Sequence, residues 1–121
     1  MTEVDHCRFV ILHHQIHDSE HWDLMLEHGD SLLTWQLPLL PDSLSRVQVS
    51  CRRLADHRKE YLTYEGPVSK NRGTVTRVDS GPMIILELTD RTCRFELQGL
   101  HFSGSLMLEH LAEDNWTLHR I

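Results

Sequence analysis

The sequence has no long hydrophobic run and little cysteine. No apolar stretch approaches the roughly 20 residues that a membrane-spanning helix needs, so we expect no membrane association. The three cysteines are widely spaced and form no Cys-x-x-Cys pair, which argues against a disulfide framework and a thiolate zinc site. Isolated thiols on strands typically fill core space. With an acidic N-terminus unlike a signal peptide, these features predict a cytoplasmic protein.

Several catalytic signatures and an overall positive charge are also missing. There is no Gly-x-Ser-x-Gly element, no dinucleotide fingerprint and no P-loop, so nothing marks a serine nucleophile or a nucleotide fold. The formal net charge is −6, which disfavours general attraction to nucleic acid. The charge is uneven, however, because residues 52–77 hold seven basic and three acidic residues, a local +4 that leaves −10 elsewhere. A local basic face can still hold a phosphate group.

Hydrophobic and polar residues alternate along most of the chain, with the period of β-strands. Turn signals such as His28-Gly29-Asp30 and Ser80-Gly81-Pro82 separate the alternating segments, and residues 42–46 and 54–60 have weak helix signals. We therefore predict a single domain over residues 1–121, mainly β, folded as a small closed or nearly closed β-barrel with one or two short helices. The expected strands cover residues 9–12, 21–27, 32–37, 47–53, 61–65, 73–79, 83–88, 94–97, 103–109 and 116–120.

Histidine is unusually frequent, and five of the ten histidines fall between positions 13 and 28: His13, His14, His17, His21 and His28. His21 and Asp23 lie two apart on a predicted strand and so share a face, with Cα atoms roughly 6–7 Å apart. An imidazole and a carboxylate at this spacing can hold one divalent ion, with a third ligand from the preceding histidines. A His/Asp set favours Mn²⁺, Fe²⁺ or Zn²⁺. The alternative is a surface or structural hydrogen-bond network.

A second group of residues has the chemistry to contact a phosphate. His57 and Tyr61 lie four apart, which places them on one face if residues 54–60 are helical. The imidazole can bind or protonate a phosphate oxygen, and the phenol can donate a hydrogen bond. The turn-rich loop that follows contains Lys70 and Arg72, which could clamp a phosphate. A packed tyrosine beside an exposed histidine is the simpler interpretation of this spacing.

The order of these motifs extends over about residues 8–120. The series comprises His21-Trp22-Asp23-Leu24-Met25-Leu26-Glu27, Trp35 and Pro38, Asp56-His57 and Tyr61, Gly73-Thr74-Val75, Asp79-Ser80-Gly81, Phe95-Glu96-Leu97 and Trp116-Thr117-Leu118. It resembles the 3′-phosphoesterase domain of bacterial DNA ligase D, also called the DNA polymerase ligase N-terminal domain family. The resemblance implies a β-barrel enzyme of DNA repair that uses manganese to trim nucleic-acid 3′ ends. Such enzymes remove a terminal ribonucleoside and convert 3′-phosphates to 3′-hydroxyls.

The resemblance also implies roles for individual residues. The metal-binding His-x-Asp of the family matches His21 and Asp23, and its His-x-x-x-Tyr matches His57 and Tyr61 as contacts to the scissile phosphate. The position of the first metal histidine is Gln15 here, so we assign the third ligand to His14 with a one-residue bulge, and His17 is the alternative. We expect Mn²⁺ or another divalent ion as cofactor. The expected partners are a DNA or DNA/RNA 3′ end and a DNA repair ligase or polymerase.

Two cations of the family pattern are absent. The arginine two residues after the aspartate is Met25 here, and the lysine after the Trp-x-x-Pro segment is Leu39. Three cations could replace them at the phosphate: Arg53, Lys70 and Arg72. Our leading hypothesis is therefore a metal-dependent phosphoesterase, and the alternative is a catalytically impaired module that binds a metal or a nucleic-acid end. Two histidines and a carboxylate on a small barrel also match non-haem iron oxygenases, and a purely structural protein is a further alternative.

Overall fold

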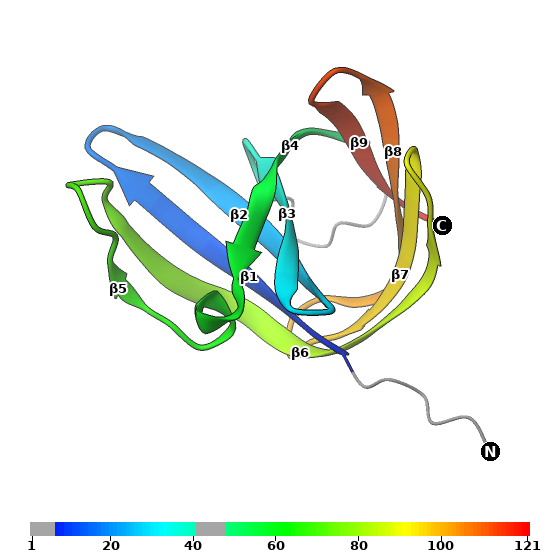
Figure 1. The fold of residues 1–121 in the computed structure, drawn as a ribbon, viewed down its shortest axis with the longest axis horizontal. Helices are drawn as coiled ribbons and strands as arrows, with labels where there is room; N and C mark the ends of the chain where they lie inside the picture. The colour runs from blue at the N-terminus through cyan, green and yellow to red at the C-terminus, as the bar shows by residue number, and fades with distance from the viewer. Residues whose placement is uncertain (1–6, 41–47) are drawn as a thin grey trace.

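The computed structural model describes residues 7–40 and 48–121, which are almost entirely β-structure (Figure 1). The strands are β1 (Cys7–Ile16), β2 (Ser19–His28), β3 (Ser31–Leu37), β4 (Val49–Arg58), β5 (Gly66–Pro67), β6 (Thr74–Leu88), β7 (Thr92–Gln98), β8 (Ser103–Ala112) and β9 (Asn115–Arg120). Within these residues the one helical element is the 3-10 turn η1 (Lys59–Leu62). None of the described residues forms a helix with the length and hydropathy that crossing a bilayer requires.

The strands close into a barrel. Eight of them pair antiparallel in the order β1-β2-β3-β4-β9-β8-β7-β6, and β6 pairs back with β1. The two-residue strand β5 adds to β6 outside this circuit. Closure satisfies backbone groups that an open sheet would leave unpaired at its edges. The predicted fold class, a mainly β protein with a closed barrel and very little helix, is confirmed.

The predicted break in the middle of β6 is wrong. Residues 80–82 are not a turn, because β6 continues through them as one strand of 15 residues. A Cβ at Gly81 would lie 2.4 Å from the backbone oxygen of Gln98, so the glycine allows a close approach of two chain segments rather than a reversal. Pro82 lies one residue before β6 begins to pair with β7. A proline without an N–H is tolerated where a strand changes partners.

Three further predictions concern the region around β4. The predicted helix over residues 54–60 is wrong, because β4 continues to Arg58 and only the single turn η1 follows. The predicted strand over residues 61–65 is wrong for the same reason, since η1 ends at Leu62 and β5 begins at Gly66. The predicted helical turn over residues 42–46 lies outside the described residues.

Side-chain alternation gives the barrel two hydrophobic clusters. The inner face carries the main core, in which Phe9, Ile11 and Trp35 are fully or almost fully buried. The opposite face of the same strands carries a smaller cluster, which we call the outer cluster: Val10, Leu12, Met25, Leu32, Leu62 and Val75. Leu62 comes from η1, and Tyr61 and Val68 pack against the cluster. The segment from η1 to β5 therefore covers part of the outer face of the barrel.

Two of the cysteines belong to the main core, as expected for core-filling thiols. Cys51 and Cys93 are buried in it, and burial raises the pKa of each thiol to about 12. Neither is part of a disulfide. Cys7 is half-buried and packs against the same cluster.

Candidate metal centre and phosphate cavity

Three side chains of the β1–β2 hairpin converge on the outer face of the barrel. The register pairs His14 directly with His21, and Asp23 follows on the same face of β2. His14 Nδ1 lies 3.1 Å from His21 Nε2 and 3.7 Å from Asp23 Oδ2, and His21 Nε2 lies 3.3 Å from Asp23 Oδ1. Ligand atoms about 2.1 Å from one ion are separated by about 3.0–3.4 Å at octahedral or tetrahedral angles. Two of the three separations fall in this range and the third, 3.7 Å between His14 Nδ1 and Asp23 Oδ2, is slightly longer, so a small shift of one side chain would let the three ligand atoms meet on a single divalent cation.

The hairpin register decides which histidine joins His21 and Asp23. The β1–β2 ladder is continuous from Phe9 opposite Leu26 to Ile16 opposite Ser19, so the bulge that we expected beside His14 is absent from this pairing. The irregularity in β1 lies between Ile11 and Leu12, in its pairing with β6. His17 is exposed in the hairpin turn with a φ of 53° and is not part of the cluster. The continuous ladder alone places His14 opposite His21.

A backbone carbonyl fixes the orientation of the His14 ring. His14 Nε2 lies 2.6 Å from the carbonyl oxygen of Arg72. A carbonyl can only accept, so Nε2 carries the proton and Nδ1 keeps its lone pair toward His21 and Asp23. Gly73 holds this loop against β1, because a Cβ there would lie 1.9 Å from the backbone oxygen of Gln15. Metal-binding imidazoles typically donate their second N–H in this way.

The carboxylate of Asp23 is buried and incompletely satisfied. Asp23 is 3% exposed, and its Oδ1 has no hydrogen-bond partner among the described residues. His21 Nε2 lies 3.3 Å from this oxygen but makes no hydrogen bond to it, and a buried acceptor without a donor costs about 1–3 kcal/mol, more when it is charged. A cation between the three side chains would supply the missing positive charge. The donor set of two imidazoles and one carboxylate fits Mn²⁺, Fe²⁺ or Zn²⁺.

A cavity of about 270 Å³ opens beside these three side chains, and we call it the phosphate cavity. Its lining includes His14 and Asp23 of the cluster and three predicted phosphate contacts, His57, Tyr61 and Arg72. It also includes Arg58, which we did not predict as a contact. The rings of His57 and Tyr61 make an edge contact, with their centroids 5.6 Å apart. The structure therefore brings this pair to the same cavity as the His/Asp cluster, through the end of β4 and η1.

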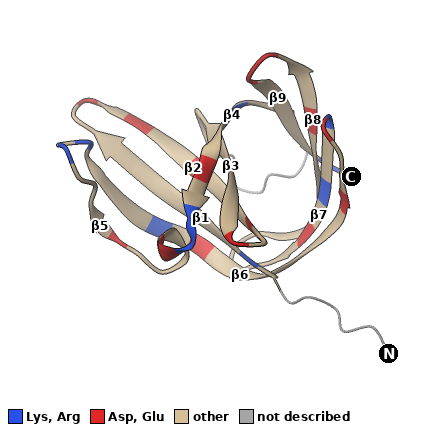
Figure 2. Ribbon diagram, in the orientation of Figure 1, with Lys and Arg blue, Asp and Glu red and all other residues tan. Residues whose placement is uncertain are grey.

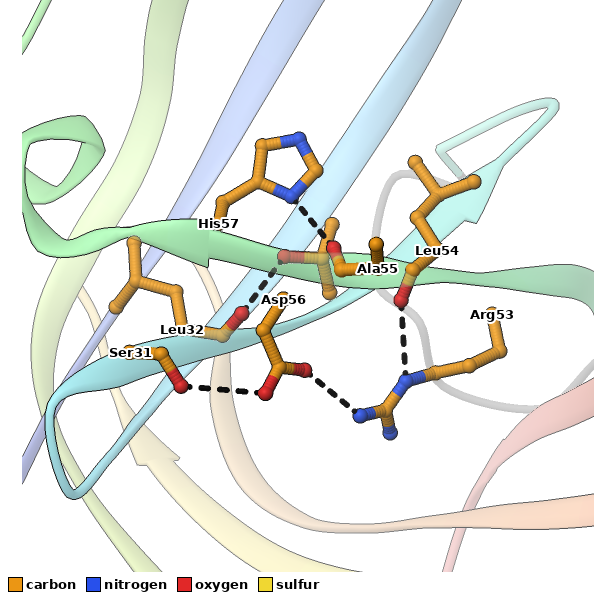
Figure 3. A network of polar contacts seen from close by, with 8 residues as sticks. Ser31, Leu32, Arg53, Leu54, Ala55, Asp56 and His57 are labelled. Atoms are coloured by element: carbon orange, nitrogen blue, oxygen red, sulfur yellow. Dashed lines mark hydrogen bonds and ion pairs between the residues drawn. The ribbon is translucent and has the colours of Figure 1, made fainter.

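His57 is held in one orientation by its own strand (Figure 3). Its Nδ1 donates to the carbonyl oxygen of Ala55 at 2.9 Å, which leaves Nε2 to meet a ligand in the phosphate cavity. On the other side of β4, Asp56 accepts from Ser31 Oγ at 3.2 Å and from Arg53 at 3.0 Å. These contacts fix the irregular end of β4, where the pairing with β3 shifts register.

Most of the basic residues between positions 52 and 77 are already neutralised by carboxylates. The ion pairs are Arg52–Asp114, Arg53–Asp56, Lys59–Glu27 and Arg77–Glu65. Among the described residues, Arg58, Lys70 and Arg72 have no carboxylate partner within ion-pair distance. In Figure 2 the ribbon is blue, the colour of Lys and Arg, at the turn between β5 and β6, the loop that contains Lys70 and Arg72. Of the seven basic residues in this segment, these three therefore keep a positive charge that no carboxylate of the described residues offsets in an ion pair.

Only one of the three predicted phosphate-binding cations lies at the phosphate cavity. Arg72 lines the phosphate cavity, whereas Arg53 and Lys70 do not. The Arg53 guanidinium lies over the Trp35 ring, 4.4 Å from its centroid, on the inner-core side of β4. Arg58 lines the cavity although sequence reasoning did not select it as a site residue. Its place directly after His57 in the basic segment was the available signal.

The two departures from the family pattern differ in their positions. Met25 lines the phosphate cavity and is buried in the outer cluster, so an apolar side chain occupies the position at which the resemblance implies an arginine. Leu39 is 53% exposed and does not line the cavity. Within the described residues, the cations that line the cavity are Arg58 and Arg72, both contributed by the segment that leaves β4 and returns to β6.

Comparisons with known proteins give one family. The profile of the DNA ligase D 3′-phosphoesterase domain matches residues 12–110. The chain is 32% identical, over 93% of its length, to the multifunctional non-homologous end joining protein LigD of Mycobacterium bovis. It is equally similar to the multifunctional non-homologous end joining DNA repair protein LigD of Mycobacterium tuberculosis. The chain covers only 16% of the length of each of these relatives.

Proposed function

The chain belongs to the DNA ligase D 3′-phosphoesterase domain family, and on this premise we propose that it is a metal-dependent phosphoesterase that trims nucleic-acid 3′ ends. Residues 1–121 would act as a single domain of this kind. The observation that supports the proposal is the phosphate cavity, which two residues of the His14–His21–Asp23 cluster, His14 and Asp23, line together with His57 and Tyr61. We further propose Mn²⁺ as the metal, with His14, His21 and Asp23 as its ligands.

The protein contributes a preformed set of ligands. When bound, a divalent cation would supply Lewis-acid stabilisation of negative charge on a phosphoryl oxygen. His14 presents its Nδ1 lone pair because its Nε2–H donates a hydrogen bond to the backbone carbonyl oxygen of Arg72. The buried Asp23 carboxylate offers the oxygen that has no hydrogen-bond partner among the described residues as an anionic ligand. This arrangement orients the ligands before substrate arrives, so little reorganisation accompanies the reaction.

The second group of residues acts on the phosphate and the leaving group. In hydrolysis of a 3′-phosphate, a water oxygen bonds to phosphorus, the bond from phosphorus to O3′ breaks, and the water releases a proton to solvent. Protonated His57 donates its Nε2 proton to the departing O3′, giving a 3′-hydroxyl and inorganic phosphate. Tyr61 donates a hydrogen bond to a phosphoryl oxygen. Arg58 and Arg72 offset its charge, and charge-assisted contacts of this kind typically contribute several kcal/mol in the transition state.

The substrate class follows from the family. The names of the relatives refer to non-homologous end joining and DNA repair. We therefore propose a 3′-phosphate or 3′-ribonucleotide at a DNA or primer-template end as substrate, in the cytoplasm, in company with a repair ligase or polymerase. The placement of Arg53 and Lys70 gives them no part in this mechanism.

One observation favours a second candidate function. Met25 places an apolar side chain in the phosphate cavity where the family pattern has an arginine. If Arg58 and Arg72 do not compensate for that charge, the same cavity would bind a phosphorylated 3′ end and a metal ion without turnover.

A test with the full chain separates these candidates. Wild-type protein with Mn²⁺ should release phosphate from a primer-template that ends in a labelled 3′-phosphate, and chelation should stop it. His21→Ala should reduce the rate to background. His13→Ala is the matched control, because His13 bonds Glu20 at 2.9 Å and stacks on Trp22 away from the cluster. A gel shift without product supports the impaired module, and activity in His21→Ala that equals wild type refutes the metal assignment.

A further inference from the structure

A second and larger cavity lies next to the candidate metal centre, and we call it the side cavity. Its volume is about 440 Å³, and its lining includes His21, Gln36, Pro38, Ser50, Arg52 and Asn115. Small-molecule sites in proteins typically have volumes of about 300–1,000 Å³. His21 is therefore shared: it belongs to the candidate metal centre and also lines the side cavity, whereas His14 and Asp23 line the phosphate cavity.

The strand register connects the side cavity to the metal centre. Asp23 pairs with Gln36, Gln36 pairs with Arg52, and Arg52 pairs with Asn115, so these four residues form one row across β2, β3, β4 and β9. Residues paired directly across strands project from the same face of a sheet. Strands are spaced about 4.8 Å apart, so three steps carry the row about 14 Å from Asp23. That length accommodates a sugar and a base.

The groups along this row suit a nucleoside. The amides of Gln36 and Asn115 and the hydroxyl of Ser50 each both donate and accept hydrogen bonds. Amide side chains of this kind recognise base edges, and hydroxyls bind sugar oxygens. Pro38 adds an apolar surface. Among the described residues, the one ion pair of Arg52 is a surface contact of 3.6 Å to Asp114, with both side chains more than half exposed, so its charge is available to a backbone phosphate.

We propose that the side cavity is the nucleoside subsite, which holds the nucleoside whose 3′-oxygen carries the phosphate. This inference rests on the proposed function, because the phosphate itself lies with His57, Arg58 and Arg72 in the phosphate cavity. The sugar then passes His21, and the base lies among Gln36, Ser50 and Asn115. The protein accordingly recognises a nucleoside 3′-phosphate rather than a phosphate group alone.

Nuclear magnetic resonance with the full ¹⁵N-labelled chain tests this subsite without requiring turnover. Two ligands are compared in the presence of Mg²⁺, which does not broaden signals: inorganic phosphate and thymidine 3′-monophosphate. Phosphate should shift signals around Tyr61 and Arg72 only. The nucleotide should also shift the side-chain NH₂ signals of Gln36 and Asn115 and bind at least about 10-fold more tightly, because it adds hydrogen bonds and apolar contact.

Two variants and one control make the result specific. Ser50 is exposed at its place on β4, so Ser50→Phe fills the side cavity and should abolish the tighter binding of the nucleotide while phosphate affinity stays unchanged. Gln36→Ala should weaken nucleotide binding in the same direction without added bulk. Ser103→Phe is the matched control, because Ser103 is exposed at the start of β8 and lines neither cavity. The amide spectrum of each variant verifies its fold.

The outcomes distinguish this inference from the proposed function. Equal affinities for the two ligands, with Gln36 and Asn115 unshifted, overturn the nucleoside subsite even if the protein hydrolyses 3′-phosphates. Unchanged nucleotide binding in both Ser50→Phe and Gln36→Ala overturns it as well. If Gln36 and Asn115 shift with the nucleotide but no 3′-phosphate is hydrolysed, the subsite is supported and the enzymatic proposal fails.

Discussion

Asp23 and Asp79 are equally buried carboxylates with opposite surroundings. Each is 3% exposed. Asp79 Oδ1 accepts from the backbone N–H groups of Ser80 and Leu100, each at 2.9 Å. Its Oδ2 accepts from His101 at 3.1 Å and Phe102 at 2.8 Å. Asp23, in contrast, has imidazoles beside it and one oxygen without a hydrogen-bond partner in the described part of the chain.

The difference separates a structural carboxylate from a candidate ligand. Backbone donors offset the desolvation of Asp79 completely, so its charge stabilises the connection between β7 and β8. Nothing in the described structure does the same for Asp23 Oδ1, and the adjacent cavity gives a cation or substrate access to the site. Burial alone therefore does not identify a functional carboxylate. A carboxylate oxygen that is buried and lacks a hydrogen-bond donor is the more informative signal.

Asp23→Asn should produce the largest effect, because it removes the charge while keeping the shape of the side chain. We expect Mn²⁺ affinity to fall by more than about 100-fold, the upper range seen when only a supporting group is lost. Mn²⁺ should raise the melting temperature of wild type and not that of the variant, since only bound metal stabilises the fold. Without metal, the variant should be at least as stable as wild type, because an unsatisfied charge has gone. Calorimetric titration and thermal melting measure both effects.

The control for this experiment is Glu20→Gln. Glu20 is exposed and bonds His13, so its neutralisation should leave Mn²⁺ affinity unchanged. If Asp23→Asn bound Mn²⁺ as tightly as wild type, the distinction between Asp23 and Asp79 would be wrong, because the unsatisfied oxygen would then have no role in binding a cation.

Asp79→Ala should show the opposite profile, with lost stability and preserved metal binding. Removing the two carboxylate oxygens strands four backbone N–H groups, and we expect the free energy of unfolding to fall by about 3 kcal/mol. Urea denaturation measures this loss, and Mn²⁺ titration under folding conditions checks the centre. Asp90→Ala, at an exposed aspartate in the β6–β7 turn, is the control and should change stability by less than about 0.5 kcal/mol. An equally small effect at Asp79 would contradict its structural role.

The smallest expected effect on stability comes from the buried thiols of Cys51 and Cys93, in which burial disfavours the ionised form of an acid. Burial raises the pKa of Cys51 and Cys93 from 9.0 to about 12. Above pH 9.0 the unfolded chain loses thiol protons that the folded chain retains, so stability must fall as pH rises. Each thiol should contribute a loss of about 1 kcal/mol between about pH 8 and 10. Urea unfolding across this range should give a shallower decline for Cys93→Ala than for wild type, and equal slopes would refute the effect.

Local sequence patterns predicted the parts of the fold that depend on neighbouring residues. The alternation over residues 21–27 and 32–37, with a turn at Gly29, predicted a hairpin, and β2 and β3 pair antiparallel as expected. The same alternation placed His21 and Asp23 on one face, and they lie together there. Where the pattern failed, a long-range contact overrode it: Gly81 and Pro82 are turn residues by composition, yet close approach to Gln98 keeps them in a strand.

The cations illustrate the limit of local reasoning at the candidate site. Arg53 and Arg72 look equivalent in the sequence, as basic residues of one charged segment. The Arg53 guanidinium lies over the Trp35 ring and forms an ion pair with Asp56, whereas Arg72 lines the phosphate cavity. We expected His57 and Tyr61 to share a face only if residues 54–60 were helical, but the end of β4 followed by η1 brings the two rings together instead.

Alternating hydrophobicity by itself determined that this protein is built mainly of β-strands and that an imidazole and a carboxylate share a strand face, because side-chain direction along a strand repeats every two residues. Only the tertiary structure decided that His14 completes the cluster, that Arg72 orients its ring, and which arginines stay without carboxylate partners. His14 and Arg72 are 58 positions apart. Contacts across such distances depend on how the strands close around the barrel, and a local period contains no record of that closure.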